Sequence, residues 1–354
     1  MRNAPSRRLA RPWRPALRLL LLLLAPGARA DWKLEYNAPT PLFLDRSYLF
    51  VSPDRIHRVG DPESPENLLF EGQLAPNLFF PQLHTGSRGG PTGEWFLSAV
   101  FNPLIRLRLL DLESRPVIPP SFIPKLTLQV AHLRRLKDVE GRARPGRGLV
   151  LAANFILGHH SNGQRGCFFL SQTGEDPHCE PEEGEPPLNE VAGSFSTNFV
   201  RGELHGQYAF SVDPRLDNAW LVGGGSFLEL NVSLGPGGIT DEQRRVQGDG
   251  TWGFNARTER IWKQHRFRGE VLLSVPFGET PSQRATVSAE VAAHPYWGAG
   301  FGIFARYVHG QDYYNILFLE KVSLWHFGLV FEVSPAARLR LEEEEEDCDE
   351  AEPR

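Results

Sequence analysis

The chain has 354 residues, in which 38 Lys and Arg face 43 Asp and Glu, for a formal net charge of −5. Seven arginines lie in the first thirty residues and nine acidic residues in the last fourteen, so the region between them is only mildly acidic. A chain without a basic face is unsuited to binding nucleic acid, and we expect no nucleic-acid partner.

Residues 1–30 have the features of a secretory signal peptide. Six arginines between positions 2 and 18 flank or precede a short apolar run at 19–24, and Ala28-Arg29-Ala30 is a small-x-small cleavage site. The apolar run is too short to cross a bilayer as a helix. We therefore expect the mature chain to begin at Asp31 and to be exported.

The next segment, residues 31–65, is rich in Pro and Asp and has no clear periodicity. We expect an N-terminal periplasmic extension here, with short strands at 42–44 and 48–51. From residue 66 to residue 333 the sequence becomes a series of strand-like runs with turn residues between them. Eleven runs are recognisable, at 67–80, 94–109, 122–136, 148–160, 194–212, 219–234, 244–255, 267–276, 285–296, 298–308 and 316–333.

Alternation is clearest at 285–291, where Thr286, Ser288 and Glu290 share one face and apolar residues share the other. Many runs exceed the roughly five or six residues usual for a strand of a soluble protein. A weak alternation repeated many times is typical of a transmembrane β-barrel, which must close because a bilayer does not tolerate sheet edges. Bacterial barrels have even strand numbers. We predict an all-β fold, a transmembrane antiparallel β-barrel of about twelve strands with one strand unrecognised.

The connection at 166–193 is long and polar and contains Cys167 and Cys179. Export makes a local disulfide between them possible, and the sequence leaves open whether they pair. Residues 334–354 form an acidic tail that we expect to be solvated and disordered. Cys348 in this tail has no evident partner.

The segment with the most chemical content is Gly158-His159-His160-Ser161-Asn162-Gly163, at the end of an alternating strand. Residues two apart on a strand share a face, so His159 and Ser161 point the same way as Phe155 and Leu157, while His160 points to the lumen. A serine becomes a nucleophile when an adjacent base takes its proton, and neutral histidine is the usual base. Such a pair beside an apolar strip favours a lipid substrate.

This segment resembles the His-x-Ser-Asn-Gly motif of the outer-membrane phospholipase A family. The resemblance covers residues 66–332 and implies a twelve-stranded barrel hydrolase, a multi-pass protein of the bacterial outer membrane. It is also carried by the segments Phe96-Leu97-Ser98-Ala99-Val100-Phe101, Ser114-Arg115-Pro116, Ile123-Pro124-Lys125-Leu126, Ser196-Thr197-Asn198 and Tyr313-Tyr314-Asn315.

By this resemblance Ser161 is the nucleophile, His159 is its base, and Asn198 orients the imidazole. The backbone N–H of Gly163 matches the family's oxyanion hole. The resemblance implies a serine carboxylic-ester hydrolase, a phospholipase A1/A2 that degrades membrane phospholipids. It also implies that the active form is a homodimer.

The family binds calcium beside its oxyanion hole, so the resemblance implies calcium as the cofactor here. The nearest matches to its ligands are Gln164 and Ser114, but the position of the family's Asp is occupied by Gly166. Calcium prefers hard oxygen ligands, carboxylates above all. Glu175 and Asp176 in the long connection are alternative donors.

Two other classes of protein share the signal peptide and the alternation. A non-catalytic porin or channel has the same barrel but needs no His–Ser pair facing lipid. A soluble periplasmic β-sandwich has the same alternation in the opposite sense, with its apolar residues inside.

Overall fold

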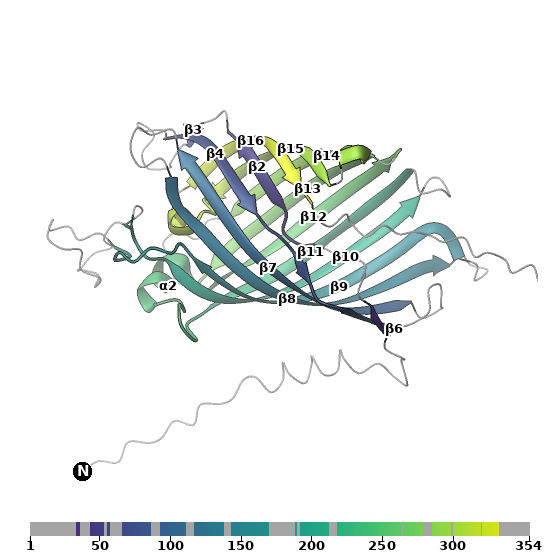
Figure 1. Cartoon of the computed structure of the whole chain (residues 1–354), viewed down its shortest axis with the longest axis horizontal. Coiled ribbons are helices and arrows are strands. Elements are labelled where there is room, and N and C mark those ends of the chain that lie inside the picture. Colours follow the sequence, from purple (N-terminus) through teal and green to yellow (C-terminus); the bar gives the residue numbers. More distant parts are fainter. Residues whose placement is uncertain are drawn as a thin grey trace, which may run out of the picture.

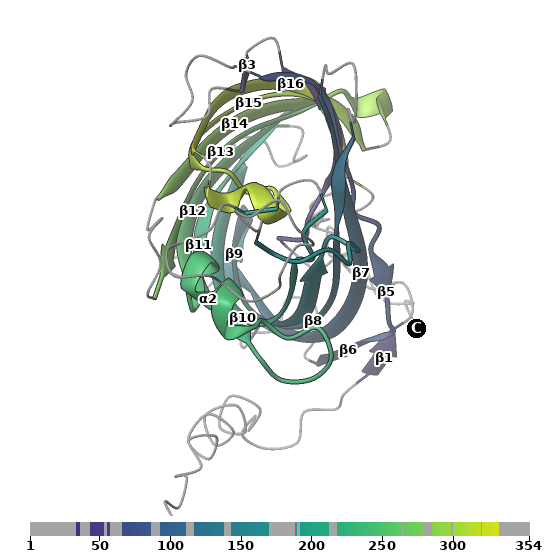
Figure 2. The ribbon, with the colours of Figure 1, turned by 90° about the vertical axis from the view of Figure 1, so that its left-hand side faces the viewer.

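The computed structural model describes residues 33–35, 43–52, 55–56, 66–85, 93–110, 117–137, 143–169, 188–189, 192–211, 218–263, 265–278, 285–298, 300–319 and 321–332. The expected signal peptide and acidic tail lie outside these residues. Within them the chain forms a tilted antiparallel barrel, seen from the side in Figure 1 and along its axis in Figure 2.

Twelve strands of the described part of the chain form a closed ring, because β4 pairs both with β2 and with β7. This confirms the predicted fold class and strand number. In ring order the strands are β7 (Glu94–Leu110), β8 (Val117–Lys137), β9 (Ala143–Ser161), β10 (Ser196–Ser211), β11 (Asn218–Val232), β12 (Gly250–Trp262), β13 (His265–Phe277), β14 (Thr286–His294), β15 (Phe301–Gln311), β16 (Lys321–Phe331), β2 (Ser47–Val51) and β4 (Glu66–Leu74).

Short elements accompany the ring. β1 (Lys33–Glu35), β5 (Leu78–Phe79) and β6 (Gln82–Thr85) extend the sheet beside the first half of β7, and β3 (Arg55–Ile56) pairs with β4. The connections between strands contain α2 (Asp241–Gln247), η1 (Tyr296–Gly298) and η2 (Asn315–Leu319). No helix in the described ranges is long and apolar enough to cross a membrane.

Three sequence-based boundaries were wrong. The twelfth barrel strand is β2, which the sequence indicated as a short strand at 48–51; it belongs to the barrel wall instead of to an N-terminal extension. The run at 244–255 begins with helix α2, because Thr240 and Gln243 form a capping box that starts a helix there. The run at 316–333 begins with η2, so its strand starts only at Lys321.

The outer face of the barrel is apolar and the lumen is polar. The lumen contains buried charge pairs, such as Arg268 with Glu290 at 2.7 Å. Apolar side chains outside and polar side chains inside are typical of a membrane barrel, whereas a soluble β-sandwich has its apolar side chains inside. Exposed apolar side chains recur on the outer wall: Phe155, Leu157, Leu204, Val222, Leu228, Leu230, Trp252, Phe254, Phe267, Val271, Val287, Val291, Ile303, Trp325, Phe327 and Leu329.

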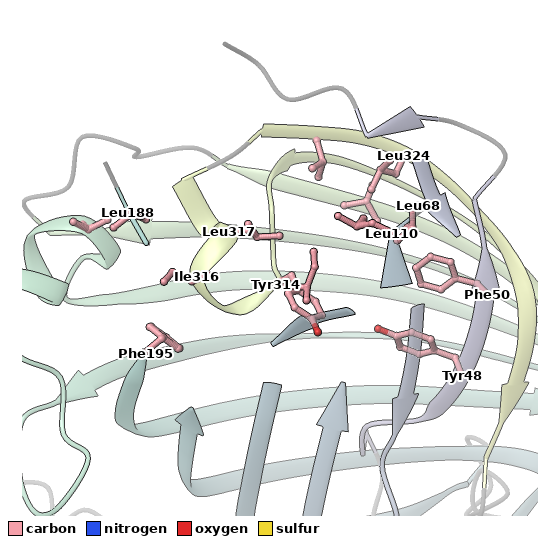
Figure 3. Packing of buried hydrophobic residues seen from close by; sticks show 14 of the residues in the cluster. Tyr48, Phe50, Leu68, Leu110, Leu188, Phe195, Tyr314, Ile316, Leu317 and Leu324 are labelled. Atoms are coloured by element: carbon pink, nitrogen blue, oxygen red, sulfur yellow. The ribbon is translucent and has the colours of Figure 1, made fainter. Parts of the chain in front are cut away.

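One end of the lumen is filled by packed side chains. Phe195, Ile316 and Leu324 are almost fully buried there, in an apolar cluster contributed by strands and by the connections above them (Figure 3). Beside the cluster, the fully buried Arg108 bonds Glu71 at 3.0 Å and Asp312 at 2.7 Å. Removing one partner from such a buried pair is strongly destabilising, so this network holds β4, β7 and the connection after β15 together.

The chain also crosses the lumen just before β2. The ring of Phe43 stacks on His205 of β10 at 3.9 Å, and Arg46 bonds Glu290 of β14 at 2.6 Å. Between them Asp45 pairs with Lys125 of β8. Because β8 and β14 lie on opposite sides of the ring, residues 43–46 bridge the two walls.

Long connections gather at one end of the barrel. The chain between β9 and β10 spans residues 162–195, and the chain between β11 and β12 spans 233–249. At the other end β12 and β13 are joined by residues 263–264 and β14 and β15 by 295–300. Since β9 ends at Ser161, the His–Ser segment lies at the end with the long connections.

Candidate active site on the outer wall

The centre of the site is a side-chain pair between two neighbouring strands. His159 of β9 and Asn198 of β10 are direct partners in the antiparallel register, and His159 Nδ1 lies 2.7 Å from Asn198 Oδ1. Directly opposed residues of an antiparallel pair lie on one face with their Cβ atoms close together. The register therefore brings together two residues that are separated by 39 positions in the sequence.

Both residues face outward. Their chain neighbours, His160 and Thr197, line the lumen, as expected for the intervening positions of strands. Inside the barrel, the ring of Phe199 covers Gly158, where an added Cβ would fall 2.1 Å from Cζ of the ring. Glycine thus allows a bulky aromatic ring at this place in the lumen. The expected inward direction of His160 is confirmed.

The amide of Asn198 is fixed by the connection that follows β11. Its Nδ2 donates to the carbonyl of Leu234 at 2.8 Å and to that of Pro236 at 3.2 Å. The hydrogen-bond network therefore assigns the nitrogen to that side and leaves Oδ1 facing His159. An amide oxygen only accepts, so the bonded Nδ1 must carry a proton, and in the neutral imidazole this tautomer leaves the lone pair on Nε2.

Ser161, the last residue of β9, lies on the same face two positions beyond His159. Its partners across the sheet are Ser196 on β10 and Phe122 on β8. Phe122 is exposed on the outer wall, and Ser196 donates outward to the carbonyl of Gly237 at 2.9 Å. No hydrogen bond joins the described side chains of Ser161 and His159, and the imidazole bonds Asn198 instead. Catalytic hydrogen bonds often tighten only when substrate binds.

The turn after Ser161 is held by Asn162, which is 1% exposed. Its Oδ1 accepts from the backbone N–H of Gln164 at 3.2 Å and of Phe195 at 3.0 Å, while Nδ2 donates to the carbonyl of Gly193 at 2.7 Å. These bonds fix a turn in which Gly163 has a φ of +68°, a conformation that favours glycine. Gly163 is exposed on the outside, next to the ring of Phe122.

The residues nearest this turn do not fit a calcium ion. Gln164 supplies a neutral side-chain oxygen, Arg165 is a cation and Gly166 has no side chain, whereas calcium prefers carboxylates. Among the residues that the structure describes, no group of three or more His, Cys, Asp or Glu could hold a metal. Ser114, Glu175 and Asp176 lie outside the described residues.

The connection at 162–195 is held near its base by Asn189. Its Nδ2 donates to the carbonyl of Cys167 at 3.1 Å, and its Oδ1 accepts from the N–H of Ala192 at 3.1 Å. Cys167 is disulfide-bonded. The other two cysteines, Cys179 and Cys348, lie outside the described residues, so the structure does not identify the partner of Cys167.

Sequence reasoning missed the second connection at the site, residues 233–240. Its carbonyls hold Asn198 and Ser196, and Gly237 lies against the imidazole of His159. The run Gly235-Pro236-Gly237-Gly238 marks a turn, but a turn sequence does not indicate which strand it folds back on.

No protein-family model and no curated protein sequence matches the chain. Among solved structures, outer membrane phospholipase A from Escherichia coli is similar with a TM-score of 0.45 and 14% identity, over 84% of this chain and 94% of that chain. The Salmonella typhi outer membrane phospholipase dimer with bound calcium gives 0.44 and 14%, over 83% and 94%. The β-domain of the Bordetella autotransporter Brka gives 0.36 and 11%, over 81% and 98%. The structure is thus similar to those of outer membrane phospholipases A, at an identity that leaves its site to be argued from its own residues.

Proposed function

We propose that the chain is a phospholipase of the bacterial outer membrane, which hydrolyses acyl ester bonds of phospholipids at Ser161, His159 and Asn198. The observation that carries this proposal is the His159–Asn198 pair on the outer wall, with Ser161 on the same face. Polar side chains on a lipid-facing surface cost free energy, so their presence there favours a functional role. Phe155 and Leu157, both exposed, continue that face towards the middle of the barrel.

The proposed chemistry is acyl transfer through a serine ester. As Ser161 Oγ bonds to the ester carbonyl carbon, Nε2 of His159 takes the hydroxyl proton. The carbonyl oxygen becomes an oxyanion beside the backbone N–H of Gly163. When the carbon–oxygen bond of the ester breaks, the imidazolium returns the proton to the leaving lysophospholipid. In the second half of the reaction His159 takes a proton from water as the water oxygen bonds to the acyl carbon, and returns it to Ser161 Oγ as the serine ester bond breaks, which releases the fatty acid.

Asn198 serves this chemistry as an orienting group. Its Oδ1 accepts the Nδ1 proton of His159, which keeps the Nε2 lone pair available for the Ser161 proton. General base catalysis of this kind contributes roughly 10²–10⁴-fold in rate. The backbone donor of Gly163 contributes about a further 10²–10³-fold by analogy with known oxyanion holes.

The connection lengths support an orientation in the membrane. Outer-membrane barrels have short periplasmic turns and longer extracellular loops. We therefore propose that the end bearing the connections 162–195 and 233–249 faces the exterior of the cell. Ser161 then lies near the outer-leaflet interface, where phospholipid esters are found.

The alternative of a passive channel is less well supported by the lumen. Residues 43–46 bridge opposite walls, and an apolar cluster around Phe195 and Ile316 fills one end. The lumen cavity that remains measures about 580 Å³ and is lined by charged pairs. A solute that passed through would have to displace these contacts.

A homodimer stays part of the proposal through the family resemblance. The apolar face around Phe155 and Leu157 would accept either acyl chains or a second barrel. Activity measured against protomer concentration in detergent tests this, because a dimer loses specific activity on dilution and a fully active monomer does not.

The direct test of the proposed function is Ser161→Ala. In mixed micelles of phospholipid and detergent, we expect the refolded wild-type protein to release fatty acid and the variant to release none above background. Thr197→Ser, a conservative change on the lumen side, is the control. Equal hydrolysis by the Ser161 variant would overturn the proposal, as would an inert wild type with high conductance in planar bilayers.

A further inference from the structure

The connection between β11 and α2 lies against the proposed site and has no part in closing the barrel. Leu234 and Pro236 use their carbonyls to bind the amide of Asn198, at 2.8 and 3.2 Å. The carbonyl of Gly237 accepts from Ser196, the residue two before Asn198 on the same face. Three successive bonds thus attach one short turn, residues 234–237, to the outward face of β10. In Figure 2 this green segment leads from the barrel wall to α2.

The same turn also limits the space beside the imidazole ring of His159. A Cβ on Gly237 would lie 2.6 Å from Cε1 of His159 and 2.8 Å from the hydroxyl of Ser196. Ordinary van der Waals contact begins near 3.4 Å, so a side chain at position 237 would collide with the ring of His159. Its φ of +73° likewise favours glycine.

We propose that residues 234–237, the clamp turn, are a positioning device for the catalytic base. This inference rests on the proposed function. The clamp turn uses both amide hydrogens of Asn198, so Oδ1 is the atom left for His159. It also blocks the ring of His159 on the side of Gly237, which limits the rotation of the imidazole.

The clamp turn explains why an Asn, and not an Asp, suits the third position. A carboxylate at 198 would place a second oxygen within hydrogen-bond distance of the carbonyl oxygens of Leu234 and Pro236, where nothing is left to donate. The repulsion would rotate the carboxylate away from His159. Asp is the usual residue that orients a catalytic histidine, so without the clamp turn Asn198→Asp should keep its activity. With the clamp turn in place, we expect Asn198→Asp to lose activity.

Two glycines of the connection provide a matched pair of variants. Gly235 and Gly237 have nearly equal φ angles, +80° and +73°, so alanine brings similar backbone strain at both. An added Cβ at Gly235 meets only Asn198 Nδ2 at 3.9 Å, whereas at Gly237 it collides with the imidazole. A misplacement of about 1 Å can cost roughly a hundredfold in rate.

The experiment compares kcat, KM and the rate of Ser161 modification by an alkyl sulfonyl fluoride in Gly237→Ala, Gly235→Ala and Asn198→Asp, with thermal unfolding as a check on the fold. We expect kcat and the modification rate to fall at least about tenfold in Gly237→Ala and Asn198→Asp with KM little changed. The loss in Gly235→Ala should be much smaller. Equal losses at the two glycines, or an unimpaired Asn198→Asp, would overturn the proposal.

A spectroscopic measurement separates this inference from the proposed function. The ¹⁵N-histidine spectrum of the full chain, with His159→Gln used to assign the signal, reports which ring nitrogen carries the proton. We expect a protonated Nδ1 in the wild type and its loss in Asn198→Asp. If the wild type shows this tautomer but is inert towards phospholipid, the function fails and the clamp stands. If the wild type hydrolyses phospholipid without it, the clamp fails and the function stands.

Discussion

Phe199 of β10 lies directly over Gly158 of β9 on the lumen side, where a Cβ on the glycine would fall 2.1 Å from the ring. This contact fixes which way the end of β9 faces, because turning Gly158 outward would turn His159 inward. Strand register is strongly specified wherever one face is packed. The direction of the proposed base is therefore set by a contact on the opposite side of the wall.

Gly158→Ala tests this contact. The methyl group must displace the ring of Phe199, and overpacking of this kind costs about 1–3 kcal/mol in the free energy of unfolding. Gly202→Ala is the control, since a Cβ at Gly202 on β10 meets nothing within 4 Å. Unfolding by urea in lipid vesicles measures both. Equal stabilities would contradict the role given to the contact.

Adjacent histidines on opposite faces give a second test. We expect His159→Gln to lower the rate of phospholipid hydrolysis by roughly 10²–10⁴-fold, because it removes the base. His160→Gln changes a residue that lines the lumen and packs edge-on against Phe195 at 4.9 Å. It should keep most of the activity. The reverse result would mean that the chemistry is inside the barrel.

The turn that carries Gly163 can be tested through Asn162. Asn162→Ala removes three hydrogen bonds from a buried site, which releases the turn and should lower kcat by up to about a hundredfold, as the loss of an oxyanion donor does. Asn189→Ala removes comparable bonds from the base of the same connection without touching the turn. A loss of kcat as large in the Asn189 variant would instead point to general loosening of the connection.

The chain segment that crosses the lumen leads to an electrical prediction. We expect the wild-type protein to conduct little in planar bilayers, because residues 43–46 bridge β8, β10 and β14. The double variant Phe43→Ala/Arg46→Ala removes the two outer attachments and should raise the conductance. Val51→Ala, on the outer face of β2, is the control. High conductance in the wild type would favour the channel alternative.

The sequence was sufficient to predict the barrel fold and the outward direction of His159 and Ser161. Both depend on alternation with a period of two, which is local and survives in long strands such as β9 and β10. β2 was placed in an extension because its five residues are too few to display a period. Its role depends on pairing with β16 and β4, which are distant in the sequence.

The site was predictable only in part, for a related reason. The residue types and spacing at 158–163 pointed to His159, Ser161 and Gly163. Asn198 was assigned through the family resemblance alone, because its contact with His159 depends on a register set across the connection 162–195. The clamp turn acts through backbone carbonyls, and a carbonyl has no sequence signature. Position 237 requires glycine because a side chain there would collide with the imidazole of His159. Only the folded structure reveals this contact.

The most direct test of the central claim is to find the residue that reacts with an alkyl sulfonyl fluoride in the detergent-solubilised full-length protein. Peptide mass spectrometry after complete inactivation should place a single stoichiometric label on Ser161, with hydrolysis lost in proportion to labelling and no label in Ser161→Ala. A label on another residue that accounts for the lost activity, or undiminished hydrolysis by a fully labelled protein, would contradict the account.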